Sequence, residues 1–327
     1  MPSVYITSVI PKECTETLQS KGFDVQVNQQ NRDLTKKELM DVFSKYDAVI
    51  TLMTNKIDRD VLSAASKKLK IIANYAVGYD NIDMSFAVRK NITVCNTPGA
   101  ASESVAEHTF LLIFACAKKV IEADKFVRLG KYQRWDPMAF LSNQIWGKTI
   151  GIVGLGKIGT FVAQIAFGGL RMKILYFDIL QSEDFELLTE ARYCSVDELL
   201  KEADIVTLHV PLTEKTHHLI SKKELKMMKN TAILINTARG PIVNQEDLIW
   251  ALKNKEIASA GLDVFEHEPE IPHELTLLDN VVLTPHIASA TVETRISMAK
   301  ISAQNIIDVF EGKEPFGLVK LPPLPRH

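Results

Sequence analysis

Short apolar runs rich in β-branched residues alternate with amphipathic stretches along almost the whole chain. The first part contains VYITSVI, DVQV, AVITL, KIIANY and ITVCNT, and the part after residue 148 contains KTIGIVG, KILYFD, DIVTLHV, AILINTA, SAGLDVF and NVVLTPH. Stretches with helical spacing, such as LTKKELMDVFSKY and QEDLIWALKN, lie between them. Strands that are apolar nearly throughout are typical of parallel sheets covered on both faces. The pattern therefore predicts an α/β fold.

Five strands in the first series and six in the second predict two doubly wound parallel sheets, which suits a chain of 327 residues. Turn residues at 96–99 separate the two series. A helical pattern then runs from Ser102 to Leu129, and its middle, 110–117, is apolar on every side, which predicts burial, between domains or between subunits. A second helix is expected over 291–312, and the proline-rich ending KLPPLPRH predicts an extended surface segment.

Charge and cysteine usage exclude several classes of function. Lys and Arg total 38 against 40 Asp and Glu, so the chain lacks the basic footprint of proteins that bind nucleic acid or anionic membranes. The four cysteines show neither zinc spacing nor the density of a disulfide framework, and no metal is expected. No signal-peptide pattern appears, and the longest apolar run, FLLIFACA, is far shorter than the roughly 20 residues that span a bilayer. We therefore expect a cytoplasmic protein.

A glycine motif indicates a dinucleotide site. Gly154, Gly156 and Gly159 follow the apolar run TIGIV and open a helical stretch, the context in which GxGxxG binds a pyrophosphate. Asp178 ends the next strand, about 20 residues further on, where an acid binds the ribose hydroxyls and repels a 2′-phosphate. These residues predict NAD as the cofactor. The alternative is a structural glycine turn with a helix-capping aspartate.

Three polar segments follow later strands, and in an open α/β sheet such ends face the ligand. They contain Arg239, Glu268 and His286. An arginine can bind the carboxylate of a 2-oxo acid, and a histidinium can protonate the oxo group as hydride reaches the carbon. A carboxylate on the other ring nitrogen would fix the tautomer. Individually, such residues are often merely solvated.

The motifs GLGKIG, HVPLTEKTHHLI, NTARGPIVN, GLDVFEHEP and TPHIASAT, in this order, resemble the D-isomer-specific 2-hydroxyacid dehydrogenases. The resemblance covers nearly the whole chain, and TLMTNKID, AVGYDNID and NTPGAASESVAEHT are most similar to the glyoxylate/hydroxypyruvate reductases of that family. It implies a Rossmann NAD-binding domain over 100–290, inserted into a flavodoxin-like substrate domain made of 1–99 and 291–327. It also implies a homodimer.

The resemblance further implies roles for individual residues. Arg239, Glu268 and His286 match the catalytic positions of the family, and Arg239 and His286 also contact substrate. Leu52 and Met53 match the substrate pocket, and the N–H groups of Val77 and Gly78 match groups that bind the substrate carboxylate. The positions that match cofactor-binding residues are Thr109, Gly154, Gly156, Lys157, Ile158, Gly159, Asp178, His209, Pro211, Thr216, Thr237, Ala238, Asp263 and Ser289. Trp135 matches a segment that reaches the neighbouring subunit.

The implied activity is NADH-dependent reduction of small 2-oxo acids, glyoxylate and hydroxypyruvate, to D-2-hydroxy acids. Another dehydrogenase of the family, acting on lactate, phosphoglycerate, a bulkier oxo acid, formate or phosphite, is the main alternative, and a non-enzymatic NAD-binding scaffold related to corepressors is the second. Two departures from the family pattern affect details: Lys157 stands where arginine is usual, and Asn55 where aspartate is common.

The remaining histidines favour ordinary structural roles. His267 is expected at the surface, and His108 is expected to be a hydrogen-bonded structural residue. The pair His217 and His218 lacks a Cys or Asp at ligand spacing, so we do not expect a metal there.

Overall fold

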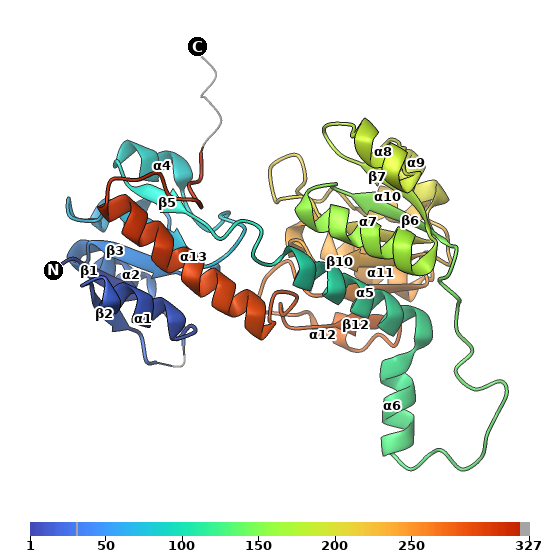
Figure 1. Cartoon of the computed structure of the whole chain (residues 1–327). Coiled ribbons are helices and arrows are strands. Elements are labelled where there is room, and N and C mark those ends of the chain that lie inside the picture. Colours follow the sequence, from blue (N-terminus) through green and yellow to red (C-terminus); the bar gives the residue numbers. More distant parts are fainter. Residues whose placement is uncertain (31, 321–327) are drawn as a thin grey trace. The chain divides into compact units, whose positions relative to one another are not determined.

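The computed structural model describes residues 1–30 and 32–320, and these divide into two compact units (Figure 1). The smaller unit comprises Met1–Ala101 and the chain from Ala290 onward, and the larger comprises Ser102–Ser289. These limits lie within two residues of the boundaries that the sequence predicts. Most of the proline-rich ending, residues 321–327, lies outside the described residues, so its expected conformation stays a prediction.

The smaller unit contains a five-stranded parallel sheet in the order β2-β1-β3-β4-β5. Its strands are β1 (Ser3–Ile6), β2 (Asp24–Val27), β3 (Ala48–Thr51), β4 (Ile71–Asn74) and β5 (Thr93–Cys95). All five predicted strands are present. Because β3 and β4 are central, every residue of both is buried, which explains why their sequences do not alternate between apolar and polar.

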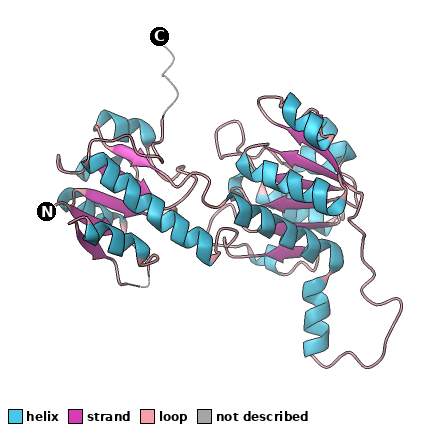
Figure 2. Cartoon of the chain, viewed as in Figure 1, coloured by secondary structure: helices cyan, strands magenta, loops and turns pink. Residues whose placement is uncertain are grey.

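Helices cover both faces of this sheet (Figure 2). On one face, α1 (Glu13–Ser20) and α13 (Val292–Phe310) pack on side chains such as Val4, Ile50 and Ile71. On the other, α2 (Lys36–Lys45), α3 (Arg59–Ala64) and α4 (Met84–Arg89) pack on Val49, Ile72 and their neighbours. The C-terminal helix thus completes the core of the N-terminal domain, with Thr291 as its N-cap.

The larger unit contains a seven-stranded parallel sheet in the order β12-β11-β10-β9-β6-β7-β8. Its strands are β6 (Thr149–Val153), β7 (Lys173–Phe177), β8 (Arg192–Tyr193), β9 (Ile205–Leu208), β10 (Ile233–Asn236), β11 (Ser259–Leu262) and β12 (Val281–Leu283). This is the Rossmann order with one strand added at an edge, so the predicted fold class is confirmed. The prediction of six strands was wrong by one, because β8 is a two-residue edge strand without an apolar run.

Helices again form two layers. One layer consists of α5 (Ser102–Lys118) and α7 (Lys157–Leu170), and the other of α9 (Val196–Glu202), α10 (Lys222–Met227) and α11 (Gln245–Lys253). Shorter elements complete the unit: α8 (Glu183–Thr189), α12 (His273–Thr276) and the 3-10 helix η1 (Gly240–Ile242).

The long helix predicted over 102–129 is two helices. Lys119 adopts a left-handed conformation with φ 53° and separates α5 from α6 (Val120–Arg128). Within one chain most of 110–117 is buried, but Leu111 and Phe114 are 55% and 40% exposed, so their burial between subunits stays a prediction. Among the described residues, no helix combines the length and the apolar character needed to cross a membrane.

Candidate active site

The residues proposed for chemistry cluster at one edge of the larger sheet. All its strands are parallel, so their carboxyl ends lie at the same edge. The glycine motif follows β6, Asp178 follows β7, and Arg239, Asp263 and Thr284 follow β10, β11 and β12. Ligands of doubly wound proteins bind at this edge, next to the strand where the order reverses, which here is β6.

The glycine loop between β6 and α7 is shaped by close backbone contacts. Gly154 has φ +99°, and a Cβ atom there would lie 2.8 Å from the carbonyl of His209. A Cβ atom on Gly159 would lie 2.1 Å from the oxygen of Gly154, so α7 could not pack so close to the loop. Around Gly156, in contrast, a Cβ atom would meet nothing within 4 Å. The loop therefore keeps an open side at the N-terminus of α7, where free N–H groups favour an anion.

Asp178, the residue predicted to bind the ribose, fixes this loop. One carboxylate oxygen accepts a hydrogen bond from the N–H of Leu155, at 2.6 Å, and the other accepts from the N–H of Ile179, also at 2.6 Å. Lys157 and Ile158 are the first two residues of α7, directly after the loop. The predicted pyrophosphate and ribose residues are thus brought together.

His209 lies immediately after β9, against Gly154. Burial lowers the pKa of its imidazole to about 3, so the ring is neutral at physiological pH. Both ring nitrogens are buried, and neither has a hydrogen-bond partner among the described residues. Beyond it, Thr216 Oγ1 donates to the carbonyl of Pro211 at 2.6 Å and closes an exposed turn.

Arg239 is positioned by a residue that the sequence analysis did not single out. Asn236, the last residue of β10, is 1% exposed. Its Oδ1 accepts from the N–H of Ala238, at 3.0 Å, and its Nδ2 donates to the carbonyl of Arg239, at 2.9 Å. Gly240 then passes so close to Phe265 that a Cβ atom would overlap the Phe265 carbonyl at 1.9 Å. The sequence does offer one signal for the role of Asn236, which is a polar residue at the end of an otherwise apolar strand.

Glu268 and His286 form the predicted pair. His286 Nδ1 lies 2.7 Å from Oε2 of Glu268, and the other oxygen of Glu268 accepts from the N–H of Phe265 at 2.9 Å. A carboxylate only accepts, so Nδ1 carries the proton and Nε2 is the nitrogen that can exchange a proton with a ligand. His286 has φ 54°, held by hydrogen bonds from its N–H to the carbonyls of Asp263 and Thr284.

Asp263 organises the loop that carries His286. Its side chain is fully buried and accepts from Thr284 Oγ1 at 2.6 Å and from the N–H groups of Ile287 and Ala288 at 2.8 and 2.7 Å. Burial alone would raise the pKa of this carboxyl, but the hydrogen bonds from His108, Thr284 and the two amides together hold its pKa below the usual value. His108 Nε2 lies 3.0 Å from Thr284 Oγ1, so the expected hydrogen-bonded role of His108 is confirmed.

Thr109, on α5, contacts the loop after β10 through Thr237. Its side chain is fully buried, with its hydroxyl 2.8 Å from the Val105 carbonyl and 3.1 Å from the hydroxyl of Thr237. The structure therefore brings these two predicted residues together, with Thr109 acting on Thr237. Ser289, the last residue of the larger unit, is half-buried.

The predicted substrate residues lie in the smaller unit, after its central strands. Leu52 and Met53 follow β3, and Val77 and Gly78 follow β4, again at carboxyl ends of a parallel sheet. Asn55 is 2% exposed; its Oδ1 accepts from Thr7 Oγ1 at 2.6 Å and from the N–H of Leu52 at 2.9 Å. Asn55, which stands where aspartate is common in the family, thus holds the loop that contains Leu52.

His217, His218 and Glu266 bring metal-binding atoms within 4.8 Å of one another. His218 Nε2 already contacts Glu266 Oε1 at 2.6 Å, and Asn244 Nδ2 faces His218 Nδ1 at 3.4 Å. Because Oδ1 of Asn244 accepts from the N–H of Asp247, the amide cannot be turned over. His218 therefore carries its proton on Nε2 and donates it to Glu266, which favours a hydrogen bond over a metal at this cluster. That no metal binds here stays a prediction.

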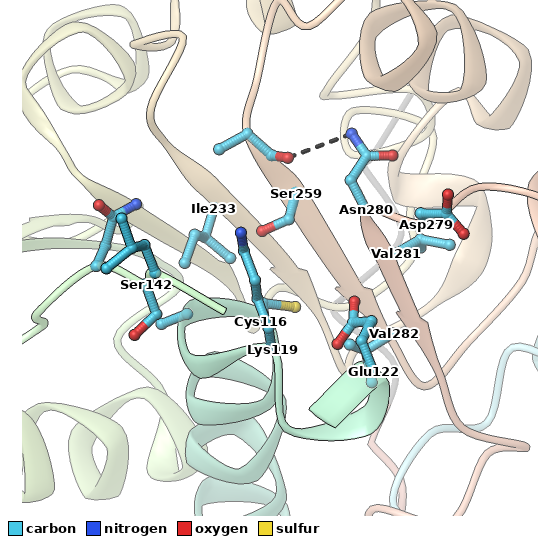
Figure 3. A pocket seen from close by; sticks show the side chains of 14 residues that line it. Cys116, Lys119, Glu122, Ser142, Ile233, Ser259, Asp279, Asn280, Val281 and Val282 are labelled. Carbon is cyan, nitrogen blue, oxygen red and sulfur yellow. Dashed lines mark hydrogen bonds between the residues drawn. The ribbon is translucent and has the colours of Figure 1, made fainter. Parts of the chain in front are cut away.

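A hollow of about 180 Å³ lies elsewhere on the larger unit (Figure 3). It is lined by the end of α5 with Cys116, by Lys119 and Glu122, and by Ile233 and Ser259, the first residues of β10 and β11. Amino ends of strands form it, so it lies opposite the edge that carries Arg239, Glu268 and His286.

The residues at the carboxyl edge fit a bound dinucleotide. The open side of Gly156 leaves room for a pyrophosphate at a helix N-terminus, and the Asp178 carboxylate lies beside it. The unpartnered ring nitrogens of His209 are buried polar atoms that a ligand at this edge could satisfy.

Comparison with known proteins agrees with this geometry. The model of the D-isomer specific 2-hydroxyacid dehydrogenase NAD binding domain matches residues 110–288. The chain belongs to the D-isomer-specific 2-hydroxyacid dehydrogenases. The predicted family, an oxidoreductase with an NAD-binding domain, is thereby confirmed.

Relatives of this dehydrogenase span nearly its full length. A glyoxylate reductase of Aeropyrum pernix is 46% identical over 325 residues, covering 97% of this chain and 96% of the relative, and one of Korarchaeum cryptofilum is 45% identical over 320 residues with the same coverage. Among solved structures, a Thermus thermophilus protein is 38% identical with a TM-score of 0.91, covering 97% of this chain and all of its own. An NADPH-dependent glyoxylate/hydroxypyruvate reductase of Sinorhizobium meliloti, in complex with NADP and malonate, is 28% identical with a TM-score of 0.86, covering 100% and 99%.

Proposed function

We propose that this dehydrogenase reduces glyoxylate and hydroxypyruvate to D-2-hydroxy acids with NADH. The observation that carries the proposal is the pair of Glu268 and His286, 2.7 Å apart, at the same sheet edge as Arg239 and the glycine loop. The names of relatives that are 45% and 46% identical over 97% of the chain support the choice of substrates.

Each catalytic side chain has one task. Arg239 offers a planar guanidinium for the substrate carboxylate, and the N–H groups of Val77 and Gly78 are assigned to the same carboxylate. His286 donates its Nε2 proton to the oxo oxygen as the carbon–oxygen double bond is reduced. Glu268 keeps the Nδ1 proton in place and stabilises the positive charge that His286 carries before the transfer. When bound, NADH supplies the hydride that adds to the oxo carbon.

The preference for NADH rests on Asp178. A ribose 2′-phosphate would lie against this carboxylate, and like charges repel at short range. The Sinorhizobium meliloti neighbour is NADPH-dependent, so cofactor choice varies within the fold and needs its own test. In Asp178→Asn the amide oxygen can still accept from Leu155, which keeps the hydrogen bond to the glycine loop, while the charge and the bond from Ile179 are lost. The ratio of kcat/KM for NADH over NADPH should fall roughly tenfold, equivalent to about 1.4 kcal/mol. An unchanged ratio would contradict the ribose role of Asp178.

The substrate is tested by following NADH oxidation at 340 nm with glyoxylate, hydroxypyruvate, pyruvate, 2-oxoisocaproate and phenylpyruvate. The expected result is the highest kcat/KM for the two small substrates. A preference for a bulky oxo acid would keep the mechanism and overturn the substrate. If no oxo acid supports NADH oxidation, the result would favour an enzyme that oxidises phosphite or formate, or the non-enzymatic scaffold.

A homodimer is the assembly we propose. Apolar side chains that the larger unit leaves exposed concentrate on α5, α6 and the segment that follows: Leu111, Phe114, Val120, Ile121, Val127, Leu129, Tyr132, Trp135 and Met138. An apolar surface of this kind is typical of a protein interface. The cytoplasm is the proposed compartment, which cell fractionation would test.

A further inference from the structure

Three consecutive carbonyl groups in the loop after β4 are held by hydrogen bonds. The oxygen of Ala76 accepts from the N–H of Thr97 at 2.9 Å. The oxygen of Val77 accepts from Nδ2 of Asn96 at 2.7 Å. The oxygen of Gly78 accepts from Nδ2 of Asn74 at 2.9 Å. Two asparagine side chains and one backbone amide therefore fix three successive peptide planes.

Fixing a carbonyl also aims the N–H group of the same peptide. In a trans peptide the two groups point in opposite directions, and Glu268–Pro269 is the only cis bond found in the described part of the chain. The N–H groups of Val77, Gly78 and Tyr79 consequently point away from the groups that hold the three carbonyls. None of these N–H groups has a hydrogen-bond acceptor among residues 1–30 and 32–320, and Val77 and Tyr79 are each 39% exposed. Successive backbone N–H groups without an acceptor, on a loop that is partly exposed, are donors that suit an anion.

The two asparagines are themselves held firmly. The backbone of Asn96 donates to the carbonyl of Gly317 at 2.9 Å and accepts from Nδ2 of the buried Asn305 at 3.1 Å. Asn74 is 1% exposed, and its Oδ1 accepts from Thr51 Oγ1 at 2.9 Å. Because their amide oxygens or backbones are already engaged, the Nδ2 groups are oriented toward the loop before any ligand binds.

A third asparagine connects this loop to the loop after β3. Nδ2 of Asn81 donates to the carbonyls of Leu52 and Asn55 at 3.1 and 3.0 Å, and Oδ1 of Asn81 lies 3.2 Å from Nδ2 of Asn74. The segment assigned to the substrate pocket and the segment assigned to the substrate carboxylate therefore share one hydrogen-bond network.

We propose that Asn74 and Asn96 are positioning residues for the substrate carboxylate. By holding the carbonyls of Gly78 and Val77, they aim a row of backbone N–H groups at the place where the carboxylate binds. This inference rests on the proposed function, since it needs an oxo acid as the ligand. The two asparagines act on the Val77–Gly78 loop of the smaller unit, whereas the glycine motif lies in the larger unit, so their loss should affect substrate binding and leave cofactor binding intact.

The test compares steady-state constants of Asn96→Ala and Asn74→Ala with those of the wild type. The KM for glyoxylate should rise about tenfold to a hundredfold, the range that corresponds to losing one or two hydrogen bonds to a charged group. The KM for NADH should stay within about twofold of the wild type. Thr35→Ala is the matched control, because it removes the N-cap of α2 in the same unit without contacting either loop, and its KM values should not change.

Asn96 is only half-buried, so Asn96→Ala keeps the test decisive if the buried Asn74→Ala variant does not fold. An unchanged KM for glyoxylate in Asn96→Ala would overturn the inference, and so would an equal rise in the KM for NADH. A wild-type enzyme that reduces no oxo acid at all would instead overturn the proposed function, and the inference with it.

Discussion

At the residue scale, the site depends on side chains whose hydrogen bonds leave one group available. His286 gives Nδ1 to Glu268 and keeps Nε2 for a ligand. Asp178 accepts a hydrogen bond from a backbone amide on each carboxylate oxygen, and each oxygen keeps a second lone pair for a ligand. Asn236 accepts from the N–H of Ala238 and donates to the carbonyl of Arg239, and these two bonds fix the backbone that carries the Arg239 side chain. In each case a hydrogen bond to a fixed neighbour orients the functional group.

His209 leads to a prediction about pH and stability. Its pKa is about 3 in the folded protein, against 6.5 when exposed, so between these values only the unfolded chain binds the proton. Stability is therefore lost as the pH falls below 6.5. From pH 7 to pH 5 this histidine should cost about 2 kcal/mol of unfolding free energy, at roughly 1.4 kcal/mol per pH unit.

Urea unfolding can check this directly, because all three tryptophans, Trp135, Trp146 and Trp250, lie in the larger unit with His209. His209→Gln cannot titrate, so its unfolding free energy should fall less between pH 7 and pH 5 than that of the wild type. Comparing the two proteins removes the contribution of the carboxylates that they share. Parallel pH profiles would contradict the assignment of a buried, neutral ring.

At the element scale, short loops after parallel strands position the functional groups, and close packing between these loops fixes them. Gly240 is the clearest case, because η1 starts where the backbone of Phe265 leaves no room for a Cβ atom. The N–H of Phe265 in turn holds Glu268. The loops after β10 and β11 are thus mechanically linked.

Gly240→Ala should therefore destabilise the larger unit by about 3 kcal/mol or more, since a backbone carbonyl cannot move aside cheaply. Turnover should fall with it, because Glu268 would shift. Gly168→Ala is the control: that residue lies in α7, and a Cβ atom there meets nothing within 4 Å, so alanine should raise stability by up to about 1 kcal/mol. The measurement is the urea midpoint by tryptophan fluorescence, and equal midpoints for the two variants would contradict the packing argument.

The elements also show what the sequence can and cannot predict. Buried strands such as IIAN and ILIN are visible in the sequence as apolar runs, so the sequence predicts eleven of the twelve strands found in residues 1–30 and 32–320. β8 was missed because an edge strand of two residues needs no such run, and the break at Lys119 was missed because nothing in a lysine signals a left-handed conformation. The side chains proposed for catalysis could be selected from the sequence by their chemistry, whereas the contacts of Asn74, Asn96 and Asn236 with the backbone are visible only in the structure.

At the scale of the whole molecule, the exposed apolar surface of α5, α6 and the following segment is the main feature that a single chain does not explain. Leu111 belongs to a helix that is otherwise largely buried, yet it is 55% exposed, and none of the residues of α6 is fully buried. The proposed homodimer would cover these side chains.

Sedimentation should therefore give about twice the 36.6 kDa mass of one chain at micromolar concentration. A charge placed in the surface, as in Leu111→Glu, should shift the equilibrium toward the monomer, because a buried unpaired carboxylate costs several kcal/mol. Val9→Glu, an exposed apolar position in the smaller unit, is the matched control and should leave the mass unchanged. A wild-type chain that sediments as a monomer would contradict the proposed assembly.

The central claim is that Arg239, Glu268 and His286 form the reducing site for a 2-oxo acid. The most direct measurement is glyoxylate-dependent NADH oxidation by the wild type and by His286→Ala, with NADH affinity determined in parallel by fluorescence. The wild type should turn over glyoxylate, and the variant should lose at least about a hundredfold in kcat, the usual contribution of a general acid, while binding NADH as tightly as before. A variant that turns over glyoxylate at the wild-type rate would contradict the account.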